Sequence, residues 1–183
     1  MNTYALIRAD LHRVVPDKVG LKALLQGLRN PGFRYLFFAR LKNGLKFRAF
    51  YPILWLIVRN YTYKFGFQIP VENLDGGLYL GHFGTIVISV NARIGKDCNI
   101  AHNVTIGTAR GLHEGAPLIG DRVWIGTGAV IVGKIEVGDD VLIAPNSFVN
   151  FDVPSHSVVI GNPAKVHPKN NPTALYINNR AYS

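Results

Sequence analysis

The stretch IGDRVWIGTGAVIVGKIEVGDDVLIAPNSFV, residues 119–149, carries an aliphatic residue at every sixth position. The same spacing runs back to residue 94, apart from one step of thirteen. The column consists of Ile94, Ile100, Ile106, Ile119, Ile125, Ile131, Val137, Ile143 and Val149. Glycine or alanine follows most of these residues, and a small or apolar residue stands two places before each. The pattern predicts an internal repeat in which each unit is a short strand closed by a tight turn.

A unit of six residues cannot bury a core alone and gains one only by stacking on its own kind. The expected fold is therefore mainly β, a parallel β-helix whose inward aliphatic column is the core. The spacing by itself leaves the handedness of the coil open.

The composition fits one domain with a helical appendage, since the chain has 183 residues and 19 glycines to serve turns. The single cysteine, Cys98, falls in the inward pattern and is expected to pack, which leaves no disulfide and no cysteine metal site. Residues 1–11 lack the apolar centre and cleavage site of a signal peptide. The longest apolar run, residues 49–58, is far shorter than the ~20 residues that span a bilayer. We expect a cytoplasmic protein.

The basic charge is concentrated in residues 1–65, which hold 12 Lys and Arg against Asp10 and Asp17, a net charge of +10. Helical spacing of apolar residues runs through this third and is broken at Asn30-Pro31-Gly32. One interpretation is a set of helices packed on the end of the β-helix with Lys and Arg at the rim. The other is a peripheral contact with the inner face of a membrane. Nucleic acid is not expected, because the basic residues alternate with large aliphatics and form no recognised module.

Residues 74–165 resemble the hexapeptide-repeat acyltransferases, most closely the serine O-acetyltransferase branch. Gly161-Asn162-Pro163-Ala164-Lys165 is similar to the closing motif of that family, and Ile7-Arg8-Ala9-Asp10 resembles the start of its bacterial members. The resemblance implies a left-handed parallel β-helix with three hexapeptides per coil, a homotrimer, and acetyl-CoA as acetyl donor. The expected domains are an N-terminal helical region (1–66), the left-handed β-helix (67–165) and a C-terminal tail (166–183).

With three repeats per coil, Leu80, Ile100, Ile125 and Ile143 should occupy one corner, provided that two extra residues lie between 80 and 94. The residues two places further on are His82, His102, Thr127 and Pro145. We expect them to form an outward column about 14 Å long, because coils stack at the strand spacing of about 4.8 Å. That length suits a pantetheine arm.

The resemblance implies a role for each of these positions. Thr127 and Pro145 match backbone contacts to CoA, Gly107 and Thr108 match a contact near its thiol end, and Lys165 belongs to the closing motif. His82 in Gly81-His82-Phe83-Gly84 matches the catalytic base, and a neutral imidazole suits removal of a proton from a hydroxyl. A backbone N–H near Gly84 could stabilise the developing negative charge.

Two further histidines are candidates near the acceptor. His102 lies one coil from His82 and is either a substrate contact or the base itself. His113 falls in the loop between residues 107 and 118, which the resemblance places at the groove between subunits. Gln68, Glu72 and Asp75 are the candidates for orienting His82.

The acceptor is inferred from departures from the family pattern. Charged residues of the serine enzymes are replaced by Gln68, by Gly81 and by Gly115-Ala116. Because an amino-acid zwitterion needs paired charges, we expect a neutral sugar hydroxyl instead, free or lipid-linked, in surface or capsular polysaccharide biosynthesis. The alternative is the serine O-acetyltransferase of cysteine biosynthesis.

Other functions and assemblies remain as alternatives. A metal hydratase would need a three-histidine zinc site, for which the sequence has no suitable spacing, so no metal is expected. A non-catalytic membrane-docking module would fail to bind CoA. Trimers could also pair into a dimer of trimers through the N-terminal helices.

Overall fold

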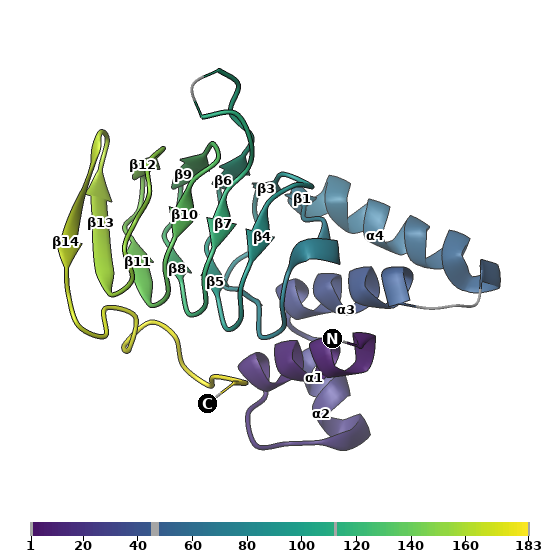
Figure 1. Cartoon of the computed structure of the whole chain (residues 1–183). Helices are drawn as coiled ribbons and strands as arrows, with labels where there is room; N and C mark the ends of the chain where they lie inside the picture. The colour runs from purple at the N-terminus through teal and green to yellow at the C-terminus, as the bar shows by residue number, and fades with distance from the viewer. Residues whose placement is uncertain (1, 45–47, 112, 183) are drawn as a thin grey trace.

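The computed structural model describes residues 2–44, 48–111 and 113–182 (Figure 1). Its N-terminal third is helical, as the sequence predicts. The helices are α1 (Thr3–Val14), α2 (Gly20–Gly27), α3 (Pro31–Gly44), the short 3-10 helix η1 (Arg48–Phe50) and α4 (Tyr51–Phe65). The predicted break is the start of α3, where the Asn30 side chain accepts a hydrogen bond from Phe33 N at 3.0 Å. Gly66 ends α4 with a φ of 71°, a left-handed conformation that glycine adopts without strain.

The chain then winds into coils whose strands form three sheets, with a second 3-10 helix, η2 (Val71–Asn73), in the first coil. Sheet A contains β1 (Phe67–Gln68), β3 (Ile86–Ile88), β6 (Val104–Gly107), β9 (Val130–Val132) and β12 (Phe148–Val149). Sheet B contains β4 (Arg93–Ile94), β7 (Leu118–Ile119) and β10 (Glu136–Val137). Sheet C contains β2 (Tyr79–Leu80), β5 (Asn99–Ile100), β8 (Trp124–Ile125), β11 (Val141–Ile143), β13 (Ser157–Gly161) and β14 (Ala164–Pro168). Neighbouring strands pair in parallel, except that β13 and β14 form an antiparallel hairpin. The fold is a parallel β-helix.

The inward aliphatic column is the core, as predicted. Ile100, Ile106, Ile125, Ile131 and Ile143 are each at most 1% exposed. The strand registers pair Leu80 with Ile100, Ile100 with Ile125, and Ile125 with Ile143, so the predicted corner is confirmed. Cys98 lies in the same core, where burial raises the pKa of its thiol to about 12. The thiol therefore stays protonated and packs, in agreement with the prediction.

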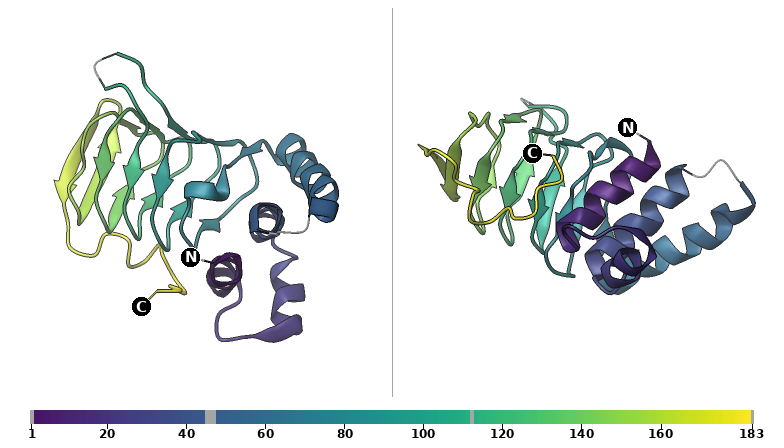
Figure 2. Two further views of the ribbon diagram at one scale, coloured as in Figure 1. Left: turned by 45° about the vertical axis from the view of Figure 1, so that its right-hand side comes forward. Right: turned by 90° about the horizontal axis from the view of Figure 1, so that it is seen from below.

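Helices α1 and α3 cover the first coils, and one buried ion pair ties them there (Figure 2). Arg40 of α3 donates from Nε to Asp10 of α1 at 2.6 Å, and both side chains are 1% exposed. Asp10 also accepts from Leu78 N, and Arg40 donates to the carbonyl oxygens of Leu74 and Asp75. The pair thus joins two helices to the backbone of the β-helix.

The C-terminal tail packs along sheet C and returns to α1, as Figure 1 shows in yellow. The hydroxyl of Thr173 donates to Asp140, and the ring of Tyr176 lies 4.8 Å from that of Trp124 in β8, tilted by 47°. At its end, the backbone N–H groups of Ala181 and Tyr182 donate to the Asp97 carboxylate. The tail therefore runs back along the β-helix from its last coils to the coil that carries Asp97.

None of the helices in the described ranges has the length and apolar content that crossing a membrane requires.

Replacing Asp10 by alanine should destabilise the protein by about 3–5 kcal/mol, because Arg40 would keep its buried charge without its partner. Chemical denaturation of wild type and Asp10→Ala measures this difference. Glu114→Ala, at an exposed loop position, is the control and should change the free energy of unfolding by less than about 0.5 kcal/mol. A loss below about 1 kcal/mol for Asp10→Ala would show that the pair does not hold the helices in place.

Candidate active site

The predicted outward column lies where each coil passes from sheet C to sheet A, an edge we call the C/A edge. Its members are His82, His102, Thr127 and Pro145. Backbone hydrogen bonds fix their spacing, since Gly128 N donates to His102 O at 3.2 Å and Asn146 N donates to Thr127 O at 2.9 Å. Asn103, Gly128 and Asn146 have φ of 59, 71 and 58°, so the same left-handed turn directly follows His102, Thr127 and Pro145.

His82 and His102 meet on this edge. Their ring centroids are 5.7 Å apart and the rings are nearly perpendicular, at 88°. His82 is exposed, whereas His102 is half-buried. The Nδ1 atom of His102 is buried and has no hydrogen-bond partner within the described residues. The pair therefore consists of a solvent-facing imidazole, that of His82, and a second imidazole whose buried Nδ1 makes no hydrogen bond within the described residues.

The loop from Gly81 to Thr85 brings the two rings together. The register places Ile86 opposite Val104, so this coil has two more residues after its histidine than the next coil has. Gly84 is one of the residues in this longer loop. It has a φ of 143°, and a Cβ there would lie 3.0 Å from the Cβ of His102. Only glycine allows the loop to approach His102 this closely.

An aromatic contact that the sequence did not predict joins this loop to α4. Phe83, 64% exposed, lies 5.5 Å from the ring of Phe65, the last residue of α4. Phe65 also stacks on Tyr61 at 5.7 Å. Two features of the sequence could have predicted this contact. One aromatic residue directly follows His82, and another stands at the end of the last helical stretch.

Within the described residues, no hydrogen bond joins His82 to any of the three side chains proposed to orient it. Glu72 accepts a hydrogen bond from Asn43 at 2.7 Å, and the carbonyl oxygen of Asp75 accepts from Arg40. Gln68 pairs with Val87 in sheet A. Glu72 follows β1 of sheet A, and Asp75 follows Leu74, which pairs with Ile94 of sheet B, so neither lies on the C/A edge that carries His82. The His82 ring instead contacts the ring of His102.

The predicted CoA contacts lie on two different edges of the β-helix. Gly107 ends β6, and the Thr108 hydroxyl lies 2.8 Å from the Ser89 hydroxyl at the edge between sheets A and B, the A/B edge. The whole of strand β6 separates this edge from His102, about 13 Å at the rise of a strand. One chain therefore does not bring Gly107 and Thr108 next to His82.

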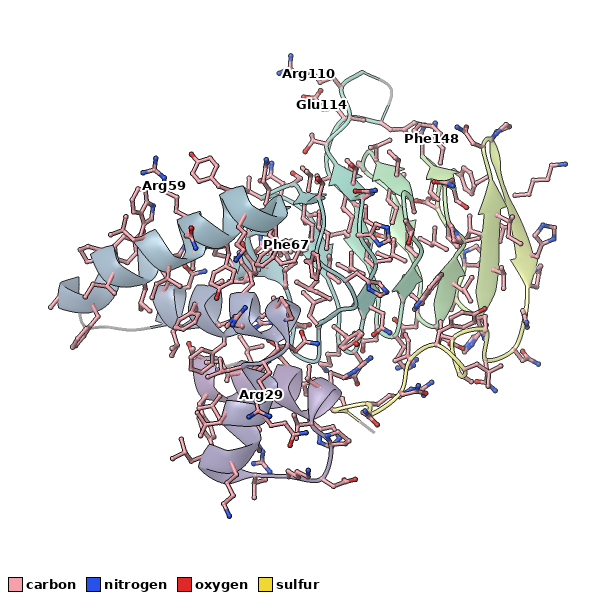
Figure 3. All side chains as sticks on the ribbon, turned by 180° about the vertical axis from the view of Figure 1, so that it is seen from behind. Arg29, Arg59, Phe67, Arg110, Glu114 and Phe148 are labelled. Atoms are coloured by element: carbon pink, nitrogen blue, oxygen red, sulfur yellow. The ribbon has the colours of Figure 1, made fainter. Side chains whose placement is uncertain are left out.

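His113 also lies on the A/B edge, in the loop that protrudes between β6 and β7. Ala109 and Gly115 exchange two backbone hydrogen bonds at the base of this loop, of 3.0 and 3.2 Å. The carbonyl oxygen of His113 accepts from Lys134 N at 3.0 Å, while its side chain is exposed. Figure 3 shows Arg110 and Glu114 on the same loop, pointing away from the β-helix. His113 is thus separated from His82 within one chain.

The C/A edge fits a long, thin donor such as acetyl-CoA. A Cβ on Gly126 would lie 2.6 Å from Pro145 N, so the coils meet closely here with no side chain between them. The edge continues from Ile143 to Val159 in β13, whose hairpin partner β14 carries the exposed Lys165. Four strand spacings, about 19 Å, separate the levels of His82 and the hairpin. A thioester at one end and a phosphate beside Lys165 at the other would match this length.

No group of three His, Cys, Asp or Glu side chains suited to hold a metal ion occurs in the described part of the chain. The expectation that no metal takes part stays a prediction.

The chain is similar to known hexapeptide-repeat proteins. Residues 116–150 match the family described as bacterial transferase hexapeptide (six repeats). The chain is 36% identical over 141 residues to a serine acetyltransferase of Helicobacter pylori, covering 76% of this chain and 82% of that one. It is 40% identical over 104 residues to serine acetyltransferase 2 of Arabidopsis thaliana, covering 56% of this chain and 32% of that one.

Solved structures give the same relationship. Serine acetyltransferase of Neisseria gonorrhoeae in complex with serine has a TM-score of 0.71 at 30% identity, over 89% of this chain and 68% of that one. Serine acetyltransferase of Brucella abortus in complex with coenzyme A has a TM-score of 0.74 at 27% identity, over 91% of this chain and 68% of that one. These likenesses confirm the left-handed β-helix, the acetyltransferase class and acetyl-CoA as the donor.

The expectation of a sugar acceptor in polysaccharide biosynthesis is wrong, because the relatives are named serine acetyltransferases. We based that expectation on the absence of charged residues at Gln68, Gly81 and Gly115-Ala116. Missing charges at aligned positions do not exclude charges supplied by other positions, and Arg110 and Glu114 stand on the protruding loop. By sequence and by structure, the chain belongs to the serine acetyltransferase family of hexapeptide-repeat transferases.

Proposed function

We propose that this protein transfers the acetyl group of acetyl-CoA to the side-chain hydroxyl of L-serine, the serine O-acetyltransferase reaction of cysteine biosynthesis. The observation that carries the proposal is the 36% identity to a serine acetyltransferase over 82% of that relative's length. The histidine pair on the C/A edge supports it, because acetyl transfer to a hydroxyl needs a base beside the thioester.

In this proposal His82 is the general base. Acetyl-CoA supplies a thioester whose acyl carbon accepts the serine oxygen. The exposed imidazole of His82 takes the hydroxyl proton as that oxygen attacks, and afterwards can return it to the departing sulfur. His102, 5.7 Å away between ring centroids, positions the His82 ring. The Gly84 N–H has no hydrogen-bond acceptor within the described residues, so it is free to donate to the acyl oxygen.

Thr127, Pro145 and Lys165 are the proposed contacts for the rest of the donor. The backbone at Thr127 and Pro145 would line the pantetheine arm. Lys165, exposed in β14, would pair with a phosphate. Their common position on one edge supports this assignment.

We further propose that the active protein is a homotrimer. Gly107, Thr108 and His113 lie on the A/B edge, so they join His82 only if the A/B edge of one copy faces the C/A edge of another. The loop of that neighbour would also bring Arg110 and Glu114, the two charge signs that the carboxylate and ammonium of serine require. Pairing of trimers through the N-terminal helices and a cytoplasmic location remain predictions.

Purified protein given acetyl-CoA and L-serine should release free thiol and form O-acetylserine. His82→Ala should lower kcat by ~10²- to 10⁴-fold, because the hydroxyl proton loses its acceptor. His167→Ala, at an exposed position in β14, is the control and should leave kcat unchanged. Absence of acetylserine would overturn the acceptor, and equal kcat in His82→Ala and wild type would overturn the base.

Gly84→Ala should lower kcat while the fold is retained. The added Cβ would press on the Cβ of His102 in a backbone conformation unfavourable to alanine, and a shift of ~1 Å in the histidines costs roughly 10²-fold. Gly20→Ala, at the start of α2, is the matched control, since Gly20 has a φ of 82° and open space around its Cβ position. Similar kcat values for the two variants would show that the loop does not set the position of the histidine pair.

A further inference from the structure

The outward face of α4 exposes large apolar and aromatic side chains. Its members are Ile53, Trp55, Leu56 and Tyr63, which are 57, 41, 57 and 75% exposed. Trp55, Leu56 and Tyr63 share one face of the helix by their spacing. Ile53 lies at the edge of this face, beside Leu56. The opposite face is the packed one, where Leu54 and Val58 are each 8% exposed.

Cations lie among these apolar side chains. The guanidinium of Arg59 is 4.9 Å from the ring centroid of Trp55 and 5.5 Å from that of Tyr63, so it is held between the two rings. Figure 3 shows Arg59 pointing away from α3 into solvent. Lys64, also exposed, stands five residues further along and lies at the border of this face, on the same side as Ile53. This mixture of Trp, Tyr, Leu and cations on one face is typical of helices that lie at a membrane surface.

The charge of the surrounding sequence selects a negatively charged partner. Residues 31–66 contain four arginines, three lysines and no aspartate or glutamate. A surface of anionic lipid would therefore meet attraction from the cations and no repulsion from carboxylates in this segment. The helix has 15 residues, about 22 Å of length, so it can lie in the plane of the interface and cannot cross it.

We propose that α4 docks this protein on the surface of an anionic lipid bilayer. The apolar side chains of the outward face enter the boundary between headgroups and acyl chains, while Arg59 and Lys64 pair with lipid phosphates. The Phe65–Phe83 contact at the end of α4 places the docked helix beside the loop that carries His82. Docking does not depend on the acetyl acceptor, so the two proposals can fail separately.

Flotation with lipid vesicles tests the proposal. Wild type should float with vesicles that contain phosphatidylglycerol, stay behind with pure phosphatidylcholine, and lose binding as salt rises. The chain has two tryptophans, so Trp124→Phe leaves Trp55 as the reporter. Its emission should shift to shorter wavelength and become protected from an aqueous quencher on the anionic vesicles.

Two double variants separate the apolar and charged contributions. Ile53→Gln with Leu56→Gln, and Arg59→Gln with Lys64→Gln, should each weaken binding roughly tenfold or more. The matched control is Leu21→Gln with Leu25→Gln on α2, where both leucines are also exposed, at 70 and 56%. It should bind vesicles like wild type. Circular dichroism checks that all variants remain folded.

Failure of wild type to bind anionic vesicles at low salt would overturn the proposal, as would binding that both α4 variants leave unchanged. An equal loss in the α2 control would also overturn it, because α4 would then have no special part. If wild type stays off vesicles and the Ile53→Gln, Leu56→Gln variant changes the molar mass in solution, the face is a contact between copies of this chain instead.

Discussion

Every coil of this protein must bury its aliphatic side chains against the coils above and below it. Strands of two to five residues have no stability of their own, so the six-residue spacing and the parallel register form together or not at all. That constraint also builds the C/A edge. Once Leu80, Ile100, Ile125 and Ile143 stack inside, the residues two places further along the chain must stack outside. The core thereby fixes the spacing of the histidine pair and of the surface proposed for the donor.

The helical third covers the coils at the start of the β-helix. Asp10 and Arg40 carry their charges into this junction, where they satisfy backbone groups that a purely apolar contact would leave unpaired. The tail reinforces the junction through Asp97, which it reaches from the far end of the β-helix. At the other side of the same junction, Phe65 of α4 touches Phe83. Stability and the placement of His82 thus depend on one region.

The fold and the edge that carries His82, His102, Thr127 and Pro145 were predictable because both follow from a local period. Long-range features were not: the Asp10–Arg40 pair joins residues 30 apart, and the tail contacts residues some 80 positions earlier. The separation of Gly107 from His102 was within reach, since a whole strand stands between them. The acceptor was predicted wrongly because missing charges at aligned positions say nothing about charges on the loop or on a neighbouring copy.

The most direct measurement is the structure of the assembled protein with coenzyme A and L-serine bound. We predict that the pantetheine arm follows the C/A edge past Thr127 and Pro145, with the sulfur beside His82 and the phosphates toward Lys165. We also predict that serine lies between His82 and the protruding loop of a neighbouring copy. Coenzyme A bound along another face, or a sulfur remote from both His82 and His102, would contradict these predictions.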